Sequence, residues 1–163
     1  MEQTTKKLRV GWFTFTCCED STILLTELFN RHWEQWLKQI EFVHAKVLQS
    51  HNEMRDMDVA FVEGAIASNE QATKLKQIRA LSQKLVAIGA CACIGLPSSQ
   101  RNTFAAAQRS EIAPFLLQFH QNEKVQTLSE IVTVDAAVQG CPMNEQAFLA
   151  ILNKYLKNFG VIT

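Results

Sequence analysis

The sequence of 163 residues lacks several features that would assign a function directly. No apolar run approaches the length of a bilayer-spanning helix, and the first residues show neither a signal-peptide core nor a twin-arginine pattern. Sixteen basic side chains balance sixteen acidic ones, and no basic stripe alternates with aromatic residues, which excludes a typical nucleic-acid-binding surface. We therefore expect a cytoplasmic protein that binds no nucleic acid and has no direct membrane insertion.

Two common binding motifs are also missing. No Cys-x-x-Cys pair occurs, although such pairs are usual at structural zinc sites. Residues 14–21 contain no glycine or lysine, which excludes a phosphate-binding loop there. With 47% hydrophobic residues and no internal repeat, the sequence predicts one well-packed core, and we expect residues 1–163 to form a single domain.

The sequence does contain an alternation of buried strands and amphipathic helices. Apolar segments predict strands at residues 6–14, 41–48, 58–62, 84–90 and 130–134. Helical spacing predicts helices from residue 20 or 21 to about 39, over 69–82, within 105–119 with an interruption at Pro114, and after Asn144. This pattern is typical of an α/β protein with a mostly parallel sheet and helices on both faces, in which ligands bind beyond the carboxyl ends of the strands.

The five cysteines lie close to these predicted strand ends. Cys17 and Cys18 follow the first strand. Cys91 and Cys93 follow the fourth strand, and Cys141 lies in the loop after the last one. In a reducing compartment such thiols are more often metal ligands or catalytic groups than disulfide partners. An iron–sulfur cluster needs four thiolates on a backbone that curls around it, and glycines beside these cysteines permit that close approach.

Three other interpretations of the cysteines stay open. A free cysteine is often a small buried hydrophobic residue, and four thiolates can also bind a structural zinc ion. Nucleophilic catalysis would need a nearby base, but His44, His51 and His120 lie in polar surroundings and we predict that they face solvent. His32 lies within the first predicted helix, and we expect it on the surface. Five thiols gathered at strand ends favour iron–sulfur ligation over these alternatives.

The chain resembles the small subunit of [NiFe] hydrogenases and the related 20-kDa subunit of respiratory complex I. The resemblance covers nearly the whole chain. It depends on the cysteine loop after the first strand, residues 62–66 (Val-Glu-Gly-Ala-Ile), residues 87–95 (Ala-Ile-Gly-Ala-Cys-Ala-Cys-Ile-Gly) and residues 140–142 (Gly-Cys-Pro). It implies a flavodoxin-like α/β fold that holds one [4Fe-4S] cluster, the proximal cluster, against a large subunit.

The resemblance also implies cluster ligands, although the first loop departs from the hydrogenase pattern. Cys91 matches the family cysteine of a Gly-x-Cys-Ala segment, and Cys141 matches the cysteine of Gly-Cys-Pro. Hydrogenases typically have Cys-x-x-Cys in the first loop. If Cys18 is the first cysteine of that motif, Ser21 replaces the second one. If Cys18 is the second cysteine, Phe15 replaces the first one. In both alignments Cys17 completes the ligand count. Tandem cysteines are what the complex I relatives use.

We therefore predict two ligands from the first loop and one from each of two later loops: Cys17, Cys18, Cys91 and Cys141. Cys93 is then the spare cysteine, a buried neighbour of the cluster, and Ser21 is an alternative oxygen ligand. Glu63 is either a carboxylate close to the cluster or the partner subunit, or a strand-end residue that faces water.

By the same resemblance the chain is an electron-transfer subunit of an oxidoreductase complex, with no active site of its own. It would relay electrons between the large subunit of a cytoplasmic [NiFe] hydrogenase and further subunits that carry flavin or iron–sulfur clusters. One alternative is the complex I-like subunit in a complex without nickel chemistry. Another is a non-redox module with structural zinc.

Overall fold

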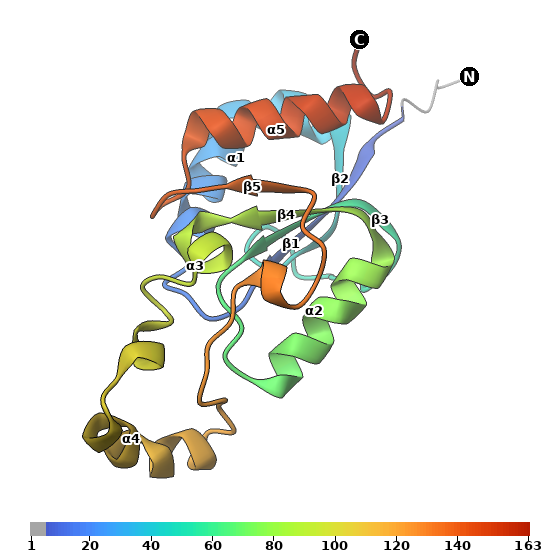
Figure 1. The fold of residues 1–163 in the computed structure, drawn as a ribbon. Helices are drawn as coiled ribbons and strands as arrows, with labels where there is room; N and C mark the ends of the chain where they lie inside the picture. The colour runs from blue at the N-terminus through green and yellow to red at the C-terminus, as the bar shows by residue number, and fades with distance from the viewer. Residues whose placement is uncertain (1–5) are drawn as a thin grey trace.

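The computed structural model describes residues 6–163, which contain a five-stranded parallel sheet with helices on both faces (Figure 1). The strands are β1 (Leu8–Thr14), β2 (Ile40–Ala45), β3 (Met57–Glu63), β4 (Ser82–Ile88) and β5 (Ala136–Val138). Their spatial order is β2-β1-β3-β4-β5, and neighbouring strands pair in parallel throughout. This is the strand order of flavodoxin-like folds, so the predicted fold class is confirmed.

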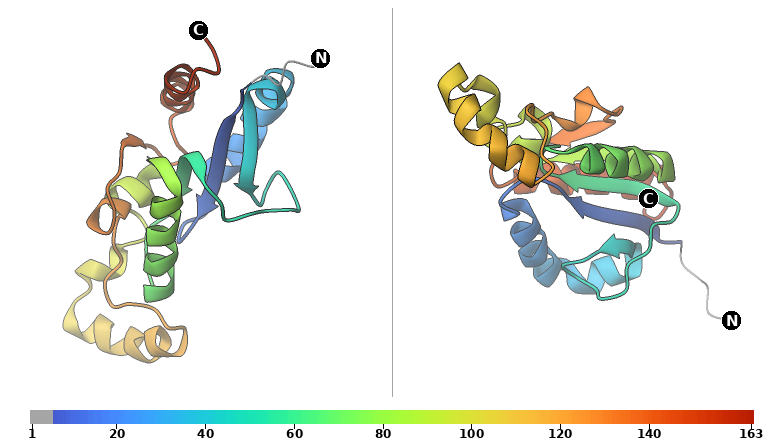
Figure 2. Two further views of the ribbon diagram at one scale, coloured as in Figure 1. Left: turned by 90° about the vertical axis from the view of Figure 1, so that its right-hand side faces the viewer. Right: turned by 90° about the horizontal axis from the view of Figure 1, so that it is seen from below.

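Helices connect these strands and cover the sheet on both sides. They are α1 (Asp20–Gln39), α2 (Asn69–Leu81), α3 (Gly89–Ile94), α4 (Ala106–Gln118) and α5 (Glu145–Asn158), with 3-10 turns η1 (Gln100–Thr103) and η2 (Leu128–Glu130). The α1 and α5 helices cover one face, and α2 covers the other (Figure 2). Two helices begin at predicted caps, since the side chains of Ser68 and Asn144 accept amide hydrogen bonds from Gln71 and Ala147.

An apolar core fills each side of the sheet. Trp12, Trp36 and Phe148 meet between the sheet and the α1–α5 pair, and a second core lies between the sheet and α2. Helical spacing places Trp33 on the same apolar face, but its side chain is 50% exposed. Of the helices within residues 6–163, none combines the length and apolar character that crossing a bilayer requires.

Three elements differ from the sequence prediction. The last strand is Ala136–Val138, whereas residues 130–134 hold the end of η2 and a turn, because three residues with two alanines give no apolar pattern. Residues 89–94 form α3 rather than extending β4, since Gly89 leaves the strand with φ 80°. Pro114 does not interrupt α4. The carbonyl of Ser110, which a proline nitrogen cannot bond, lies at an exposed residue where water can satisfy it.

Candidate metal-cluster site

Three loops at the carboxyl edge of the sheet bring four of the cysteines together. Cys17 and Cys18 lie between β1 and α1, Cys91 lies in α3 directly after β4, and Cys141 follows β5. The sulfurs of Cys18 and Cys141, with a carboxylate oxygen of Asp20, lie within 4.8 Å of one another. Cys17 and Cys91 belong to one small apolar cluster. The edge of the sheet therefore holds the four thiols that the sequence singled out.

The first cysteine loop is fixed against the chain that leaves β3. The backbone of Thr16 exchanges two hydrogen bonds with that of Ala65, at 3.0 and 2.9 Å. Gly64 has φ 93°, and a Cβ atom there would lie 2.7 Å from the backbone of Phe15. Only glycine permits this close approach, which explains why the segment 62–66 matters for the site.

Glu63 fixes the start of α1 immediately after the cysteines. Its side chain ends β3 and is buried, with 2% of the residue exposed. The carboxylate accepts hydrogen bonds from the amides of Ser21 and Thr22, both at 3.1 Å, and from the Thr22 hydroxyl at 2.6 Å. These amides belong to the first turn of α1, where backbone donors have no partner within the helix. Burial raises the pKa of Glu63, and the hydrogen bonds from Thr22 and Ser21 oppose that shift. The interpretation of Glu63 as a water-facing residue is therefore wrong.

The four thiols differ in exposure, and the pKa of two of them, Cys17 and Cys141, is raised. Cys18 and Cys141 are exposed, Cys17 is half-buried and Cys91 is buried. Burial raises the pKa of Cys17 to about 12. The thiol of Cys141 donates to Asp20 Oδ2 at 3.1 Å, and this bond raises the pKa of Cys141 to about 11. A metal that binds these sulfurs must displace protons, because thiolates are the ligating form.

Cys93 and Ser21 are directed into the protein. The thiol of Cys93 lies 3.7 and 3.8 Å from the carbonyl oxygens of Ala87 and Val138, and burial raises the pKa of Cys93 to about 11. Ser21 is fully buried, and its hydroxyl accepts a hydrogen bond from the Met143 amide at 3.2 Å. All five cysteines lie within the described residues, and there none forms a disulfide.

The histidines were predicted with mixed success. His44 is 6% exposed and packs against Phe13 with ring centroids 4.4 Å apart, so its predicted exposure is wrong: β2 carries it into the core. His51 and His120 are exposed, as predicted. His32 is half-buried against Trp36 on α1, with ring centroids 5.5 Å apart.

Asp20 is a further residue of the site that the cysteine pattern does not predict. Its carboxylate lies beside the sulfurs of Cys18 and Cys141, and hydrogen bonds from Cys141, Ser21 and Cys18 lower the pKa of Asp20 in spite of partial burial. The available signal was its position two residues after Cys18, at the predicted helix start.

Comparison with known proteins gives one family and several relatives. Residues 17–155 match the family model described as NADH ubiquinone oxidoreductase, 20 Kd subunit. The chain is 25% identical over 163 residues to one subunit of the vhu F420-non-reducing hydrogenase of Methanococcus voltae, covering 90% of this chain and 56% of that protein. It is 28% identical over 111 residues to the NAD-reducing hydrogenase HoxS subunit delta of Cupriavidus necator, covering 58% of this chain and 53% of that protein. The chain thus spans about half the length of the curated relatives it matches.

A similar fold occurs in the crystal structure of an NAD+-reducing [NiFe]-hydrogenase in the H2-reduced state. The TM-score with one chain of that structure is 0.78 at 23% sequence identity. The match covers 94% of this chain and 93% of the other chain.

Proposed function

Because the chain belongs to the family of the 20-kDa subunit of NADH ubiquinone oxidoreductase, we propose that it binds one [4Fe-4S] cluster and relays electrons in an oxidoreductase complex. The complex we propose is a cytoplasmic [NiFe] hydrogenase. In it the chain is the small subunit, a single domain over residues 1–163 without an active site of its own. Its cluster exchanges electrons with the large subunit and with flavin or iron–sulfur subunits. The hydrogenase relatives support this assignment.

The convergence of four thiols from three loops is the observation that carries the proposal. We propose that Cys17, Cys18, Cys91 and Cys141 bind the four irons, one thiolate for each. The loops of Cys91 and Cys141 are joined next to these residues, since the Ala90 amide donates to the Gly140 carbonyl at 2.8 Å. Soft sulfur donors on a curled backbone suit an iron–sulfur cluster, which supplies single-electron transfer when it is bound.

The chain also provides groups that would tune such a cluster. The Ser98 hydroxyl lies 3.0 Å from the Thr16 carbonyl oxygen and 3.2 Å from Cys91 Sγ, so its one proton can be donated to either atom. The Glu19 amide donates to Cys17 Sγ at 3.4 Å. Hydrogen bonds to ligand sulfurs stabilise the more negative, reduced state. The carboxylate of Asp20 beside Cys141 acts in the opposite direction, because it adds negative charge next to the site.

Two alternatives compete with this function. The tandem Cys17–Cys18 favours the complex I type of subunit, in a complex whose large subunit has no nickel chemistry. A structural zinc site would use the same four sulfurs without electron transfer.

Purification of the chain without oxygen tests the cluster. About four irons and about four sulfides per chain, with a brown colour, are expected from the cubane stoichiometry. Colourless protein with one zinc would overturn the electron-relay function. The nickel content of the large subunit that co-purifies then separates the hydrogenase from the complex I type.

Serine variants test the proposed ligands. Cys17→Ser and Cys18→Ser should each lose or degrade the cluster, because each removes one of four thiolates. Cys93→Ser is the matched control, and it should keep the cluster because its sulfur faces backbone carbonyls of the sheet. An unchanged cubane spectrum in Cys17→Ser, measured by electron paramagnetic resonance of the reduced protein, would contradict this ligand set.

A further inference from the structure

Helix α4 stands apart from the sheet and its covering helices in Figure 1 and in the left view of Figure 2. Within its 13 residues, all of which the structure describes, no side chain is buried. Phe115, Leu117 and the following Phe119 are 59%, 79% and 62% exposed. An isolated helix of this length is marginal in water, and clustered exposed apolar side chains mark interaction surfaces.

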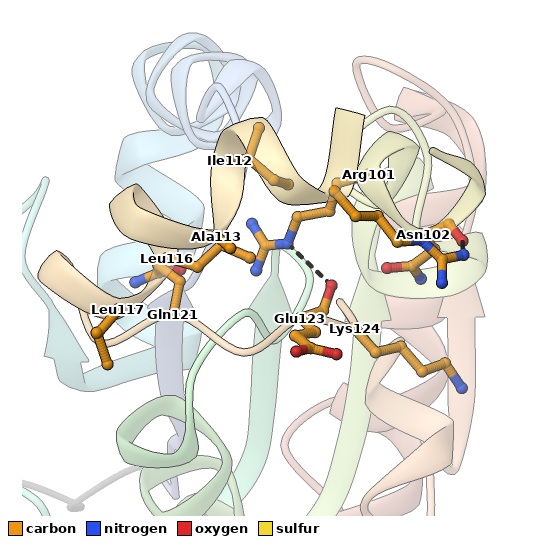
Figure 3. Close-up of a pocket in the computed structure, with 10 residues that line it drawn as sticks. Arg101, Asn102, Ile112, Ala113, Leu116, Leu117, Gln121, Glu123 and Lys124 are labelled. Atoms are coloured by element: carbon orange, nitrogen blue, oxygen red, sulfur yellow. Dashed lines mark hydrogen bonds between the residues drawn. The ribbon is translucent and has the colours of Figure 1, made fainter. Parts of the chain in front are cut away.

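A pocket of about 520 Å³ lies between α4 and the chain around Glu123 and Lys124 (Figure 3). Four side chains of α4 form its apolar wall: Ile112, Ala113, Leu116 and Leu117. The pocket and the exposed aromatic rings make α4 apolar over much of its circumference. We call α4, Phe119 and the pocket the α4 surface.

The rim of this pocket is positively charged. Arg101, Arg109 and Lys124 line it, against one acidic residue, Glu123. Lys124 pairs with Glu130, but among the described residues neither arginine forms an ion pair. Their guanidinium groups donate only to backbone carbonyls, for example from Arg101 to the Asn122 carbonyl at 2.6 Å. Acidic side chains on a partner would complement these two charges.

The α4 surface is directly connected to the cysteine site. Arg101 donates to the carbonyl of Ala67, and the side chain of Asn102 makes two hydrogen bonds with the backbone of Val125, at 2.7 and 2.8 Å. Ala67 and Val125 pack in the same cluster as Cys91 and Cys17.

Apolar exposure also continues along the chain between the cysteines and α4. Ile94 is 55% exposed and Leu96 is 50% exposed. A protein that covers the cysteine edge therefore meets further apolar surface on the way to α4.

We propose that the α4 surface is a docking site for the subunit that covers the cysteine edge, and that this subunit places an apolar segment with acidic flanks against α4. The identity of that subunit as the hydrogenase large subunit rests on the proposed function. The partner is then held at two positions, one at the exposed Cys18 and Cys141 and the other at α4.

Charge and apolar variants on the exposed surface test this docking. Leu117→Glu should raise the dissociation constant for the co-produced large subunit at least about tenfold, as for other apolar anchors at the centre of an interface. Leu37→Glu is the matched control, since Leu37 is 50% exposed on α1, and it should stay within about twofold because it lies outside the interface. Arg109→Glu should weaken binding and reduce its salt dependence, whereas Lys38→Glu on α1 should not.

Iron and sulfide are measured in the same samples, so that loss of docking and loss of the cluster are distinguished. Binding by Leu117→Glu as tight as that of the unaltered chain overturns the docking site. The docking site is also overturned if the unaltered chain shows no affinity for the large subunit, whether or not the chain holds a cluster. If the unaltered chain holds no cluster, the electron relay is overturned. If Leu117→Glu still weakens binding to the large subunit in that case, the docking site is supported.

Discussion

The imidazole of His44 is enclosed by strands β1 and β2. Its Nδ1 lies 3.2 Å from the carbonyl oxygen of Trp12, and its ring packs against that of Phe13. Burial lowers the pKa of His44, because a charged imidazolium loses hydration there. Lys74 and Lys46 act in the same direction by repulsion, while the hydrogen bond to Trp12 opposes it. The folded protein thus keeps His44 neutral at a pH where the unfolded chain takes up a proton.

Folding stability should therefore depend on pH through His44. The unfolded state binds more protons than the folded state once the pH falls below the ordinary histidine pKa of about 6.5. Above that pH His44 is neutral in both states and does not lower the free energy of unfolding. The free energy of unfolding should therefore decrease as the pH falls from about 7 to about 5. His44→Gln should flatten this decrease in urea denaturation series, and His120→Gln, at an exposed site, should not. An equal slope in His44→Gln and the unaltered chain would contradict this account.

Individual site residues could be predicted from the sequence to different degrees. The placement of Cys17, Cys91 and Cys141 at one edge of the sheet could be predicted because each follows an apolar run, and parallel strands bring their carboxyl ends to one edge. The burial of His44 and Glu63 could not be predicted in the same way. It depends on which strands become neighbours, since β1 lies between β2 and β3.

Between elements, Glu63 joins the end of β3 to the first turn of α1. Glu63→Ala removes the acceptor of the Thr22 amide and of the Thr22 hydroxyl, and each unsatisfied buried donor costs about 1–3 kcal/mol, whereas the Ser21 amide keeps Asp20 Oδ1 at 2.7 Å. We expect the free energy of unfolding to fall by about 3 kcal/mol, because partial relaxation offsets some of this loss. Glu63→Gln keeps one acceptor oxygen and should lose less. Denaturant titration measures both variants.

The same variants should also lose cluster occupancy, because the cysteine loop lies directly before the helix that Glu63 caps. Glu27→Ala, at an exposed position of α1, is the control and should change stability by less than about 0.5 kcal/mol. Stability and iron content of Glu63→Ala equal to those of Glu27→Ala would show that the cap has no such role.

Helices with local signals were easier to predict than the short elements around the site. The caps of Ser68 and Asn144 are encoded within one turn of sequence, so α2 and α5 begin where the sequence predicts. The three residues of β5 are specified by pairing with β4 rather than by their own pattern. The separation of α4 from the sheet could not be predicted either, because its apolar residues mark no single face that would show where the helix packs.

At the scale of the whole molecule, the proposed cluster ties together loops that are distant in the sequence. Cys18, Cys91 and Cys141 follow β1, β4 and β5, and the hydrogen bonds that join these loops include Ala90 to Gly140 and Met143 to Ser21. A cofactor that binds only the folded state stabilises it by its binding free energy. The cluster should therefore contribute to the stability of the whole domain and not only to the local geometry.

Removal of the cluster by anaerobic chelation should lower the melting temperature by about 5–10 °C, because 1 kcal/mol corresponds to about 2–4 °C for a domain of this size. Hydrogen exchange should accelerate first at the amides of Thr16 and Ala90, which hold the cysteine loops, while the buried β3 strand stays protected. Cys93→Ser with its cluster intact is the control and should melt close to the unaltered protein. If chelation left both the melting temperature and the exchange at Ala90 unchanged, the four thiols would not be joined by a shared cluster.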